Sequence, residues 1–316
     1  MLRSLICSLL LVLLLLPTDL FGRHIIGGVI TYESLGGGNY RFVMKMYRDC
    51  NCVDCADFDA VASIGIYNCG PGGTSCSSLG QGGFFQRLDV PILGVEEVAE
   101  PDYPCLIPPD VCVQEGTYEF STNLPLSEQS YHISYQRCCR NVTISNIVAP
   151  QNSGATFTVE ITPEAQLNGN DSPVFNDFPP TIICAGQPLV FDHSASDSDG
   201  DQLVYEFCSP LLGGGPVLMN PGYTTCEGAQ PTPSCPPPYA DVSFTAPAFT
   251  PAEPMGGDPI VTIDPLTGII TGTPNVLGQY VVGVCVSEFR NGVLLSRVFR
   301  DFQFNVAPCD PTVEAV

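Results

Sequence analysis

Three aspartates are the residues whose type and spacing best suit chemistry: Asp197, Asp199 and Asp201 alternate with small residues in one short run. Alternate residues of an extended segment point the same way, so these carboxylates could converge on one cation that prefers oxygen ligands, as Ca²⁺ does. The run is not an EF-hand loop, because Gly200 stands at its fourth position and Cys208 takes the place of the bidentate glutamate. A tight turn, in which the Asp side chains bond to nearby backbone amides, is the alternative. Both interpretations stay open at this point.

A second group, Cys50, Cys52 and Cys55, has the spacing of half a zinc ligand set. Zinc sites usually take four ligands from two knuckles at fixed spacing, and only Cys138-Cys139 could supply the second knuckle here. Structural disulfides are the favoured interpretation, because cysteines at this density suit an oxidising compartment, where pairs form and persist.

Spacing suggests two local disulfides, one between Cys105 and Cys112 and one between Cys226 and Cys235, since each pair flanks a short Pro-containing loop. Distance and Cβ orientation decide whether such pairs close. Loss of Cys7 with an N-terminal leader would leave 16 − 1 = 15 cysteines. An odd count leaves at least one thiol free or paired with another chain, and a candidate lies at position 309.

The chain offers little for catalysis. It has 3 histidines, His24, His132 and His193, and no Gly-x-Ser-x-Gly motif or other motif that couples a serine to one of them. Hydrolysis of glycosides needs one particular pair of carboxyl groups, and nothing singles out a pair among the 33 acidic residues. The chain also lacks Trp, the usual flat platform for a sugar ring. We therefore expect a protein that is not an enzyme.

Residues 1–22 have the pattern of a secretory signal peptide. Arg3 supplies a positive start, residues 5–16 form an apolar run, and a short break follows before Arg23. The run is shorter than the roughly 20 residues that a membrane-spanning helix needs. No second long apolar stretch follows, so we expect a secreted or outer cell-surface protein without membrane insertion.

The excess of acidic residues excludes two classes of partner. The chain has 33 acidic and 11 basic residues, a formal net charge of −22, and Lys45 is its only lysine. Such a surface repels nucleic acid and anionic membranes, and neither is expected as a partner.

Apolar residues recur with the two-residue period of strands. In residues 155–162, Phe157, Val159 and Ile161 alternate with polar side chains, and no stretch of ten or more residues shows the helical period. Residues 23–165 are expected to form one β-sandwich with Cys-rich inserts, and residues 172–308 a second, with 309–316 as a linker or tail. The predicted fold class is all-β: two antiparallel, immunoglobulin-like sandwiches braced by disulfides, with very little helix.

The second half resembles immunoglobulin-like β-sandwiches of the cadherin and dystroglycan type. The resemblance rests on the Asp/Gly turn and strand of residues 196–208, the Gly-punctuated residues 263–274 and the alternating strand of residues 280–287. It implies a domain that displays, adheres or spaces.

Other segments are similar to the N-terminal region of large surface proteins of gliding bacteria, which carry polycystic-kidney-disease-type repeats and a gliding-motility-associated C-terminal domain. The resemblance implies export to the outer surface by the type IX route, and it brings no catalytic residues. This chain departs from the family in lacking that sorting domain and in its richer cysteine clusters. The similar segments are His24-Ile-Ile-Gly-Gly28, Tyr47-Arg-Asp-Cys50, Tyr131-His-Ile-Ser-Tyr-Gln-Arg-Cys-Cys-Arg-Asn141, Ser172-Pro-Val-Phe175, Phe191-Asp-His-Ser-Ala195, Val281-Val-Gly-Val-Cys-Val-Ser-Glu288 and Arg300-Asp-Phe302.

Together these patterns predict a non-catalytic extracellular or cell-surface module, structural or adhesive, within a longer secreted protein. Its partners would be other domains of that protein, or a polysaccharide or protein at the surface. The alternative function is a polysaccharide-binding module, assisted by calcium at Asp197, Asp199 and Asp201. No other cofactor is expected.

Overall fold

The computed structural model describes residues 25–51, 56–76, 83–99, 106–107, 112–180, 182–215 and 226–311. The expected leader, residues 1–22, lies outside these ranges, as do Cys52, Cys55 and Cys105.

Strands dominate the described chain, as the alternating pattern predicts, and the expectation of an all-β protein with very little helix is confirmed. The strands of the N-terminal half are β1 (Ile25–Gly36), β2 (Asn39–Asp49), β3 (Val61–Cys69), β4 (Phe84–Glu97), β5 (Leu106–Ile107), β6 (Val113–Asn123), β7 (Ser130–Arg137) and β8 (Ala155–Ile161). Those of the C-terminal half are β9 (Val174–Phe175), β10 (Ile182–Cys184), β11 (Leu189–Asp192), β12 (Ala195–Ser196), β13 (Gln202–Cys208), β14 (Thr262–Ile263), β15 (Ile269–Gly272), β16 (Gly278–Arg290), β17 (Val293–Ala307) and β18 (Asp310–Pro311).

Helical residues within the described ranges are confined to α2 (Pro163–Asn168) and the single turns η1 (Pro71–Gly73) and η2 (Pro150–Asn152). The caps of α2 explain why it forms in a polar stretch between strands. The Thr162 hydroxyl accepts a hydrogen bond from the Ala165 amide at 3.2 Å, Pro163 stands in the first turn, and Gly169 ends the helix with a φ of 65°.

The longer strands of the N-terminal half form one antiparallel sheet in the order β1-β2-β6-β4-β3-β7-β8. The β1–β2 register sets Tyr32 opposite Phe42, with both rings inside the fold. Because successive side chains point to opposite faces of a strand, Arg41 and Lys45 project from the outer face of β2.

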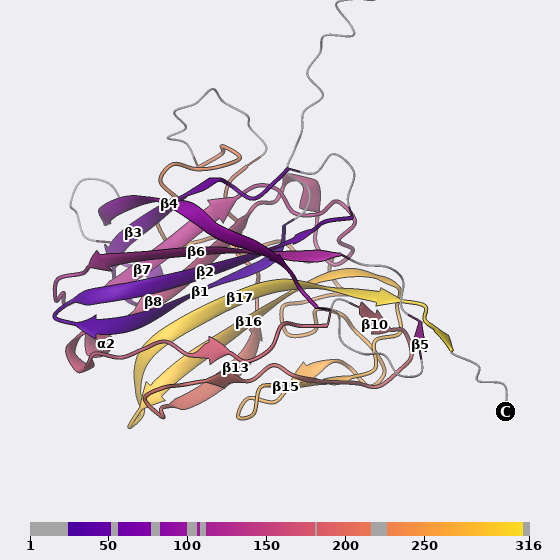
Figure 1. The fold of residues 1–316 in the computed structure, drawn as a ribbon. Helices are drawn as coiled ribbons and strands as arrows, with labels where there is room; N and C mark the ends of the chain where they lie inside the picture. Colours follow the sequence, from indigo (N-terminus) through magenta and orange to yellow (C-terminus); the bar gives the residue numbers. More distant parts are fainter. Residues whose placement is uncertain are drawn as a thin grey trace, which may run out of the picture.

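β17 joins the two halves of the chain. One of its edges pairs with β16 along its length, while the other edge pairs with β8 at residues 296–298 and with β1 at residues 301–302. We call residues 296–302 the seam. Both outer strands of the N-terminal sheet thus end on one strand from the C-terminal half, and the pairing continues through β16 to β13 (Figure 1). The expected division into two separate sandwiches is therefore not confirmed.

Glycine makes the closest approach at the seam possible. A Cβ atom on Gly27 would lie 2.3 Å from the carbonyl oxygen of Asp301, and one on Gly28 would lie 2.7 Å from the sulfur of Met46. A larger residue at position 27 would clash with the backbone of β17 and force β1 away from it, whereas one at position 28 would require the Met46 and Phe157 side chains to shift.

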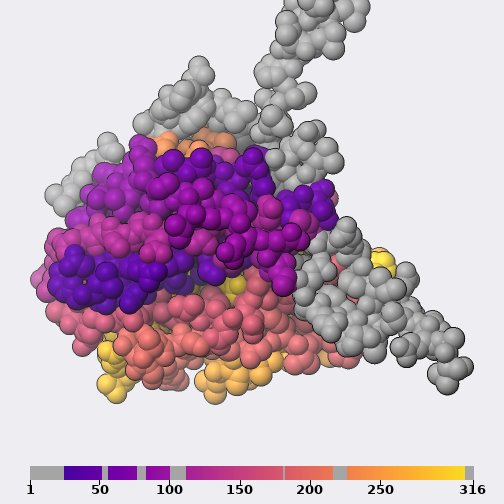
Figure 2. Space-filling view, in the orientation of Figure 1, coloured from indigo at the N-terminus to yellow at the C-terminus, as the bar shows by residue number. Residues whose placement is uncertain are grey.

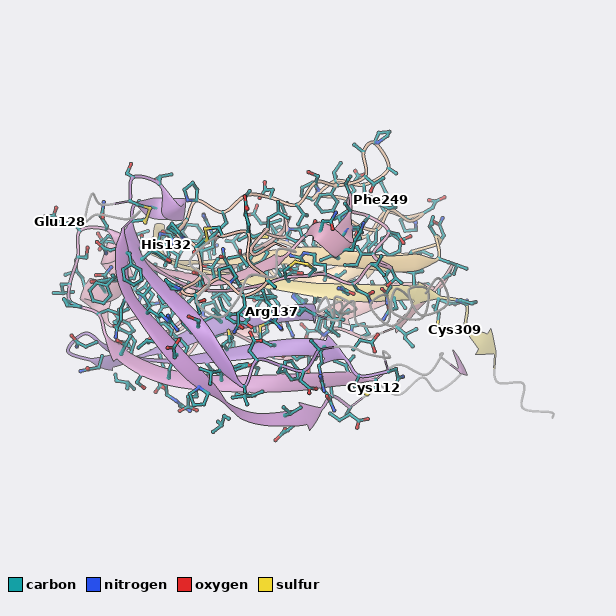
Figure 3. All side chains as sticks on the ribbon, turned by 90° about the horizontal axis from the view of Figure 1, so that it is seen from above. Cys112, Glu128, His132, Arg137, Phe249 and Cys309 are labelled. Carbon is teal, nitrogen blue, oxygen red and sulfur yellow. A yellow bond between two sulfur atoms is a disulfide. The ribbon has the colours of Figure 1, made fainter. Side chains whose placement is uncertain are left out.

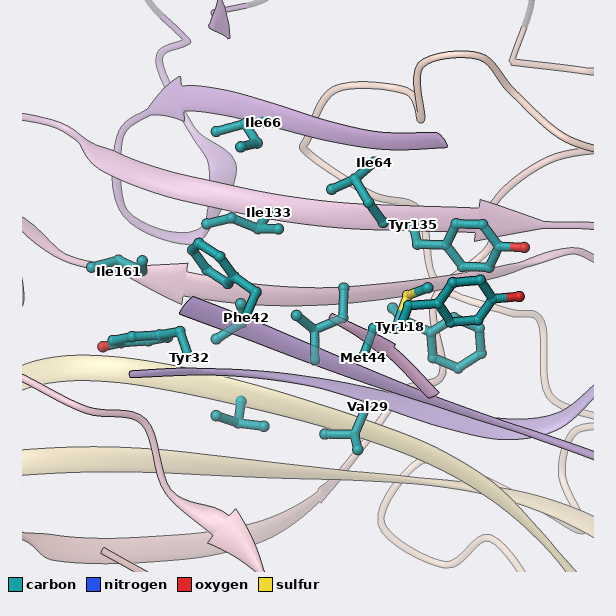
Figure 4. Packing of buried hydrophobic residues seen from close by; sticks show 14 of the residues in the cluster. Val29, Tyr32, Phe42, Met44, Ile64, Ile66, Tyr118, Ile133, Tyr135 and Ile161 are labelled. Carbon is teal, nitrogen blue, oxygen red and sulfur yellow. The ribbon is translucent and has the colours of Figure 1, made fainter. Parts of the chain in front are cut away.

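The described residues form three apolar clusters, and β17 contributes to the two larger ones. The first fills the rolled N-terminal sheet with side chains such as Phe42 and Ile133 (Figure 4), and it includes Val298 from β17. The second lies in the C-terminal half and includes Phe302 and Phe304 from β17. In the space-filling view of Figure 2, the N-terminal half covers most of the upper part of this face and the C-terminal half most of the lower part, with some orange residues at the upper edge.

Six disulfides occur among the described residues: Cys50–Cys112, Cys69–Cys76, Cys138–Cys139, Cys184–Cys309, Cys208–Cys285 and Cys226–Cys235. Cys226 and Cys235 form the pair that their spacing suggested. Cys138 and Cys139 bond to each other, so neither is free to complete a zinc site.

The expected Cys105–Cys112 disulfide is wrong. Cys112 is bonded to Cys50, with their Cα atoms 5.1 Å apart. The β2–β6 register explains this, because it pairs Asp49 with Val113 and so leaves the two flanking cysteines side by side. Cys309 bonds to Cys184 of β10 and is not the odd thiol. Cys112 and Cys309 both lie at the end of the molecule opposite Glu128 (Figure 3).

Candidate functional site

The three aspartates do not converge as a set. Asp197 accepts a hydrogen bond from the Asp201 amide at 2.7 Å, and Gly200 between them has a φ of 80°, which is the geometry of a tight turn. Asp199 instead accepts from the Asp171 amide at 3.0 Å. The turn interpretation therefore describes the local structure of this run.

A different trio does come together. Asp197, Asp201 and Glu288 each place a carboxylate oxygen within 4.8 Å of the others. Glu288 enters through the β13–β16 register, which pairs it with Leu203, two residues beyond Asp201. Nothing in the spacing of the sequence marked Glu288 as a member of this group.

Glu288 is fully buried, and only one of its two oxygens is satisfied. Oε2 accepts from Asn170 at 2.9 Å and from Ser296 at 2.5 Å, whereas Oε1 has no partner among the described residues. Burial, reinforced by the nearby charge of Asp197, raises the pKa of Glu288 to about 8. At neutral pH this side chain therefore keeps its proton.

Arg290 supplies the positive charge of the cluster. Its guanidinium binds Asp201 through two hydrogen bonds of 2.8 and 2.5 Å and lies 3.5 Å from Asp199. These bonds hold the pKa of Asp201 below its usual range. The cluster offers the hard oxygen ligands that Ca²⁺ takes. A bound cation would need a deprotonated Glu288, because metal ligands must lose their protons.

The cluster also connects the halves of the chain. Asn170 and Asp171 belong to the connection after α2, and the Asp171 carboxylate accepts from the Ser34 amide of β1 at 2.7 Å. The neighbouring Ser172 hydroxyl accepts from the Tyr32 amide at 2.8 Å. The carboxylates thus lie where the connection, β1 and β16 meet.

A buried ion pair joins a loop of the N-terminal half to the seam. Arg140, from the Cys-Cys-Arg stretch, forms an ion pair of 2.5 Å with Asp301 of β17, and both side chains are almost completely buried. Arg140 also donates to the carbonyls of Gly154 and Leu211, each at 3.1 Å. Burial raises the pKa of Asp301, and the charge of Arg140 opposes that shift.

Arg300, which directly precedes Asp301 in β17, is surrounded by aromatic rings. Its guanidinium carbon lies 4.6 Å from the Phe175 ring centroid, 5.9 Å from that of Phe178 and 6.0 Å from that of Phe302. One nitrogen donates to the Asp177 carbonyl at 2.9 Å. Such cation–π contacts partly compensate a buried charge.

His193 lies in the same aromatic cluster. Its ring centroid is 4.8 Å from that of Phe175 and 5.0 Å from that of Phe302. Neither ring nitrogen has a hydrogen-bond partner within the described ranges, and the side chain is fully buried. Burial, followed by the charge of Arg300, lowers the pKa of His193 well below its usual value, so the ring is neutral.

A groove of about 330 Å³ lies over Arg300, between the outer face of β1 and β2 and residues 174–178. Charged side chains of both signs line it, and most are paired with each other. Arg41 binds Glu119 at 2.8 Å, and Lys45 binds Glu115 at 2.9 Å.

A second pocket, of about 370 Å³, holds the pair that most resembles catalytic machinery. The strand registers set His132 beside Glu160, and Glu160 beside Arg297. However, Glu160 accepts from the Gly72 amide at 3.2 Å, and His132 contacts the Gly70 carbonyl at 3.2 Å. In the described part of the chain His132 bonds to no hydroxyl or thiol, so this pair holds η1 against the sheet.

Comparison with known proteins identified no matching family model, no matching curated protein and no matching solved structure. Across the described ranges, no helix has the length and apolar character needed to span a membrane.

Proposed function

We propose that this chain is an exported, non-catalytic module that acts by structure and adhesion at the cell surface. The observation that carries this proposal is the pairing of β17. This last long strand pairs with β16, β8, β1 and β10, and the Cys184–Cys309 disulfide ties its end to β10. A strand held by four neighbours resists removal, which suits a module that passes force between a surface and whatever follows residue 311.

The chemistry of the site residues supports the same role. His132, Glu160, Arg140 and Asp301 each bond to backbone or to each other across strands, and they leave no nucleophile coupled to a base in the described structure. The disulfides suit an oxidising compartment outside the cytoplasm.

The test is adhesion of beads coated with the purified mature protein to cells or to isolated surface material. We expect retention of coated beads under flow, and loss of retention after reduction of the disulfides. Equal retention of beads coated with an unrelated acidic protein would contradict an adhesive role.

The second candidate is a polysaccharide-binding module assisted by calcium. Two observations favour it: the groove over Arg300, and the carboxylates of Asp197, Asp201 and Glu288 with an unpartnered oxygen on Glu288. A glycan array probed with and without a chelator tests both parts. Binding that survives chelation would keep the groove and remove calcium from the proposal.

A further inference from the structure

Two buried arginines at the seam, Arg140 beside it and Arg300 within it, differ in one respect. Arg140 has a carboxylate partner, Asp301, at 2.5 Å. Arg300 is equally buried, at 2% exposure, but in the described part of the chain no carboxylate lies within ion-pair distance of it, and its Nε has no hydrogen-bond partner. A buried charge without an opposite charge is unfavourable, and the three Phe rings offset only part of that cost.

Three cationic side chains line the groove, and Arg300 is the one that remains able to bind an anion. The other two cations of the groove, Arg41 and Lys45, are already bound to glutamates. Burial lowers the pKa of Arg300, while Tyr47, Glu115 and Asp177 act in the opposite sense from nearby positions. The guanidinium therefore stays charged and retains an unused donor.

The rest of the groove selects the kind of anion. The carboxylates of Glu33, Glu115 and Asp177 line it and accept hydrogen bonds, so a ligand must bring hydroxyl donors as well as a negative group. The rings of Tyr47 and Phe178, 4.3 Å apart, give it apolar surface. A volume of about 330 Å³ is at the small end for ligand pockets and suits a sugar unit better than a folded partner.

We propose that this groove binds a uronic acid unit of an acidic polysaccharide, with the sugar carboxylate on Arg300 and hydroxyls on the acidic rim. This inference rests on the proposed polysaccharide-binding function. An acidic peptide fits less well, because it brings few hydroxyl donors and its other acids would face the glutamates of the rim.

The charge of the chain gives the proposal an unusual salt dependence. A protein of net charge −22 repels a polyanion, and dissolved salt screens that long-range repulsion. The contact with buried Arg300 is screened much less. Affinity for a uronic acid oligomer should therefore hold or rise between low and physiological salt, whereas binding to an exposed basic patch would fall.

The experiment titrates the mature protein with a digalacturonate and with the matching neutral digalactose, and follows the methyl resonances of Val43 and Val174 in the groove wall. The acidic sugar should bind more tightly and shift both valines. Arg300→Gln should weaken its binding by about tenfold or more, as expected for loss of a hydrogen bond to a charged group. Lys45→Gln, at an exposed position, should weaken it less. Arg87→Gln, which removes an equally exposed cation outside the groove, should leave binding unchanged.

The outcomes separate this inference from the function on which it rests. Equal binding of the neutral sugar, or shifts confined to other residues, would overturn the uronic acid assignment while sugar binding stands. A chain that binds neither these sugars nor any glycan of a wide panel would overturn polysaccharide binding itself. If Arg300→Gln does not fold, the preference for the acidic sugar and the Val43 and Val174 shifts still decide. Tighter binding of an acidic peptide than of the uronic acid would also contradict the proposal.

Discussion

Arg140 and Asp301 form a 2.5 Å ion pair although 2% and 0% of their side chains are exposed. The partners come from a loop after β7 and from the seam, so the pair joins the two halves of the chain. Its charges are matched inside the protein, where water cannot replace a missing partner.

Arg140→Met should therefore lower the free energy of unfolding by about 3–5 kcal/mol, because it leaves the Asp301 carboxylate buried without a partner. The double variant Arg140→Met/Asp301→Leu should recover much of that loss. Chemical denaturation of the three proteins measures both effects. As a control, Arg87→Met breaks the exposed Arg87–Asp89 pair and should cost less than about 1 kcal/mol. Equal costs for the buried and exposed pairs would contradict the role given to Arg140.

Stability should fall as the pH rises through neutrality, because of Glu288. Burial raises the pKa of this carboxyl from 4.5 to about 8, so between these values the folded protein holds a proton that the unfolded chain has lost. Its contribution is fully present below about pH 4.5 and is lost as the pH rises through about 8. Glu288→Gln mimics the protonated form and should flatten the dependence of unfolding free energy on pH in this window. A variant with the wild-type slope would rule out Glu288 as its source.

His193 has the opposite effect on the pH dependence of stability, because its contribution is lost as the pH falls. Its folded-state pKa lies well below the ordinary 6.5. Between these two pKa values the unfolded chain binds a proton at His193, while the ring in the folded protein stays neutral. The contribution is present above pH 6.5 and is lost as the pH falls below it. His193→Phe removes this sensitivity and two unpartnered nitrogens, and should raise stability at pH 7 by roughly 1 kcal/mol. His132→Phe is the matched comparison, because it breaks the contact with the Gly70 carbonyl and should destabilise the protein. Thermal melts from pH 4.5 to 7.5 compare the two variants.

Calcium, if it binds at the carboxylates, should raise the melting temperature by mass action, with roughly 2.7 kcal/mol of stabilisation at a concentration of 100 Kd. The effect should grow from pH 6 to pH 8 as Glu288 loses its proton. Asp197→Asn should remove most of the rise, whereas Asp199→Asn should remove little, because Asp199 lies outside the trio. Equal melting temperatures with millimolar Ca²⁺ and with a chelator would contradict calcium binding, and residues 197–201 would then be explained as a tight turn alone.

The Cys184–Cys309 disulfide should matter more than the short Cys226–Cys235 loop. It closes a separation of 125 residues against 9, and longer closed loops restrict the unfolded chain more. Replacing Cys184 and Cys309 by Ser should lower stability by about 2–4 kcal/mol. The double Ser variant of Cys226 and Cys235 should lower it less, and denaturation of the two variants compares them. The reverse order would show that strain or local packing decides.

Local patterns in the sequence predict most of the strands. The two-residue alternation at residues 155–162 locates β8 within one residue, and the alternation at residues 280–287 lies inside β16. The helix α2 is missed because it has no apolar period, and its caps at Thr162 and Gly169 decide it. Residues 242–246 form no strand, and Phe244 makes only an isolated bridge to Ile147.

What depends on distant pairing could not be predicted from one sequence. The partner of Cys112 follows from the β2–β6 register, and the position of Glu288 follows from the β13–β16 register. Both registers join segments far apart in the chain, and no spacing rule reveals them. The same holds for the seam, which pairs strands of the two expected domains in one sheet.

The seam also determines when during synthesis the fold can be completed. Gly27 and Phe302 are neighbours across it although 302 − 27 = 275 residues separate them along the chain. Until β17 has been synthesised, β1 and β8 keep unpaired edges, which invite pairing with other chains. Contacts between such distant residues also form slowly. A chain of this kind therefore completes its fold only after nearly all of it has emerged. If the expected leader of residues 1–22 directs it through a membrane, it can cross as an open chain and finish assembly on the far side, where its cysteines can also be oxidised.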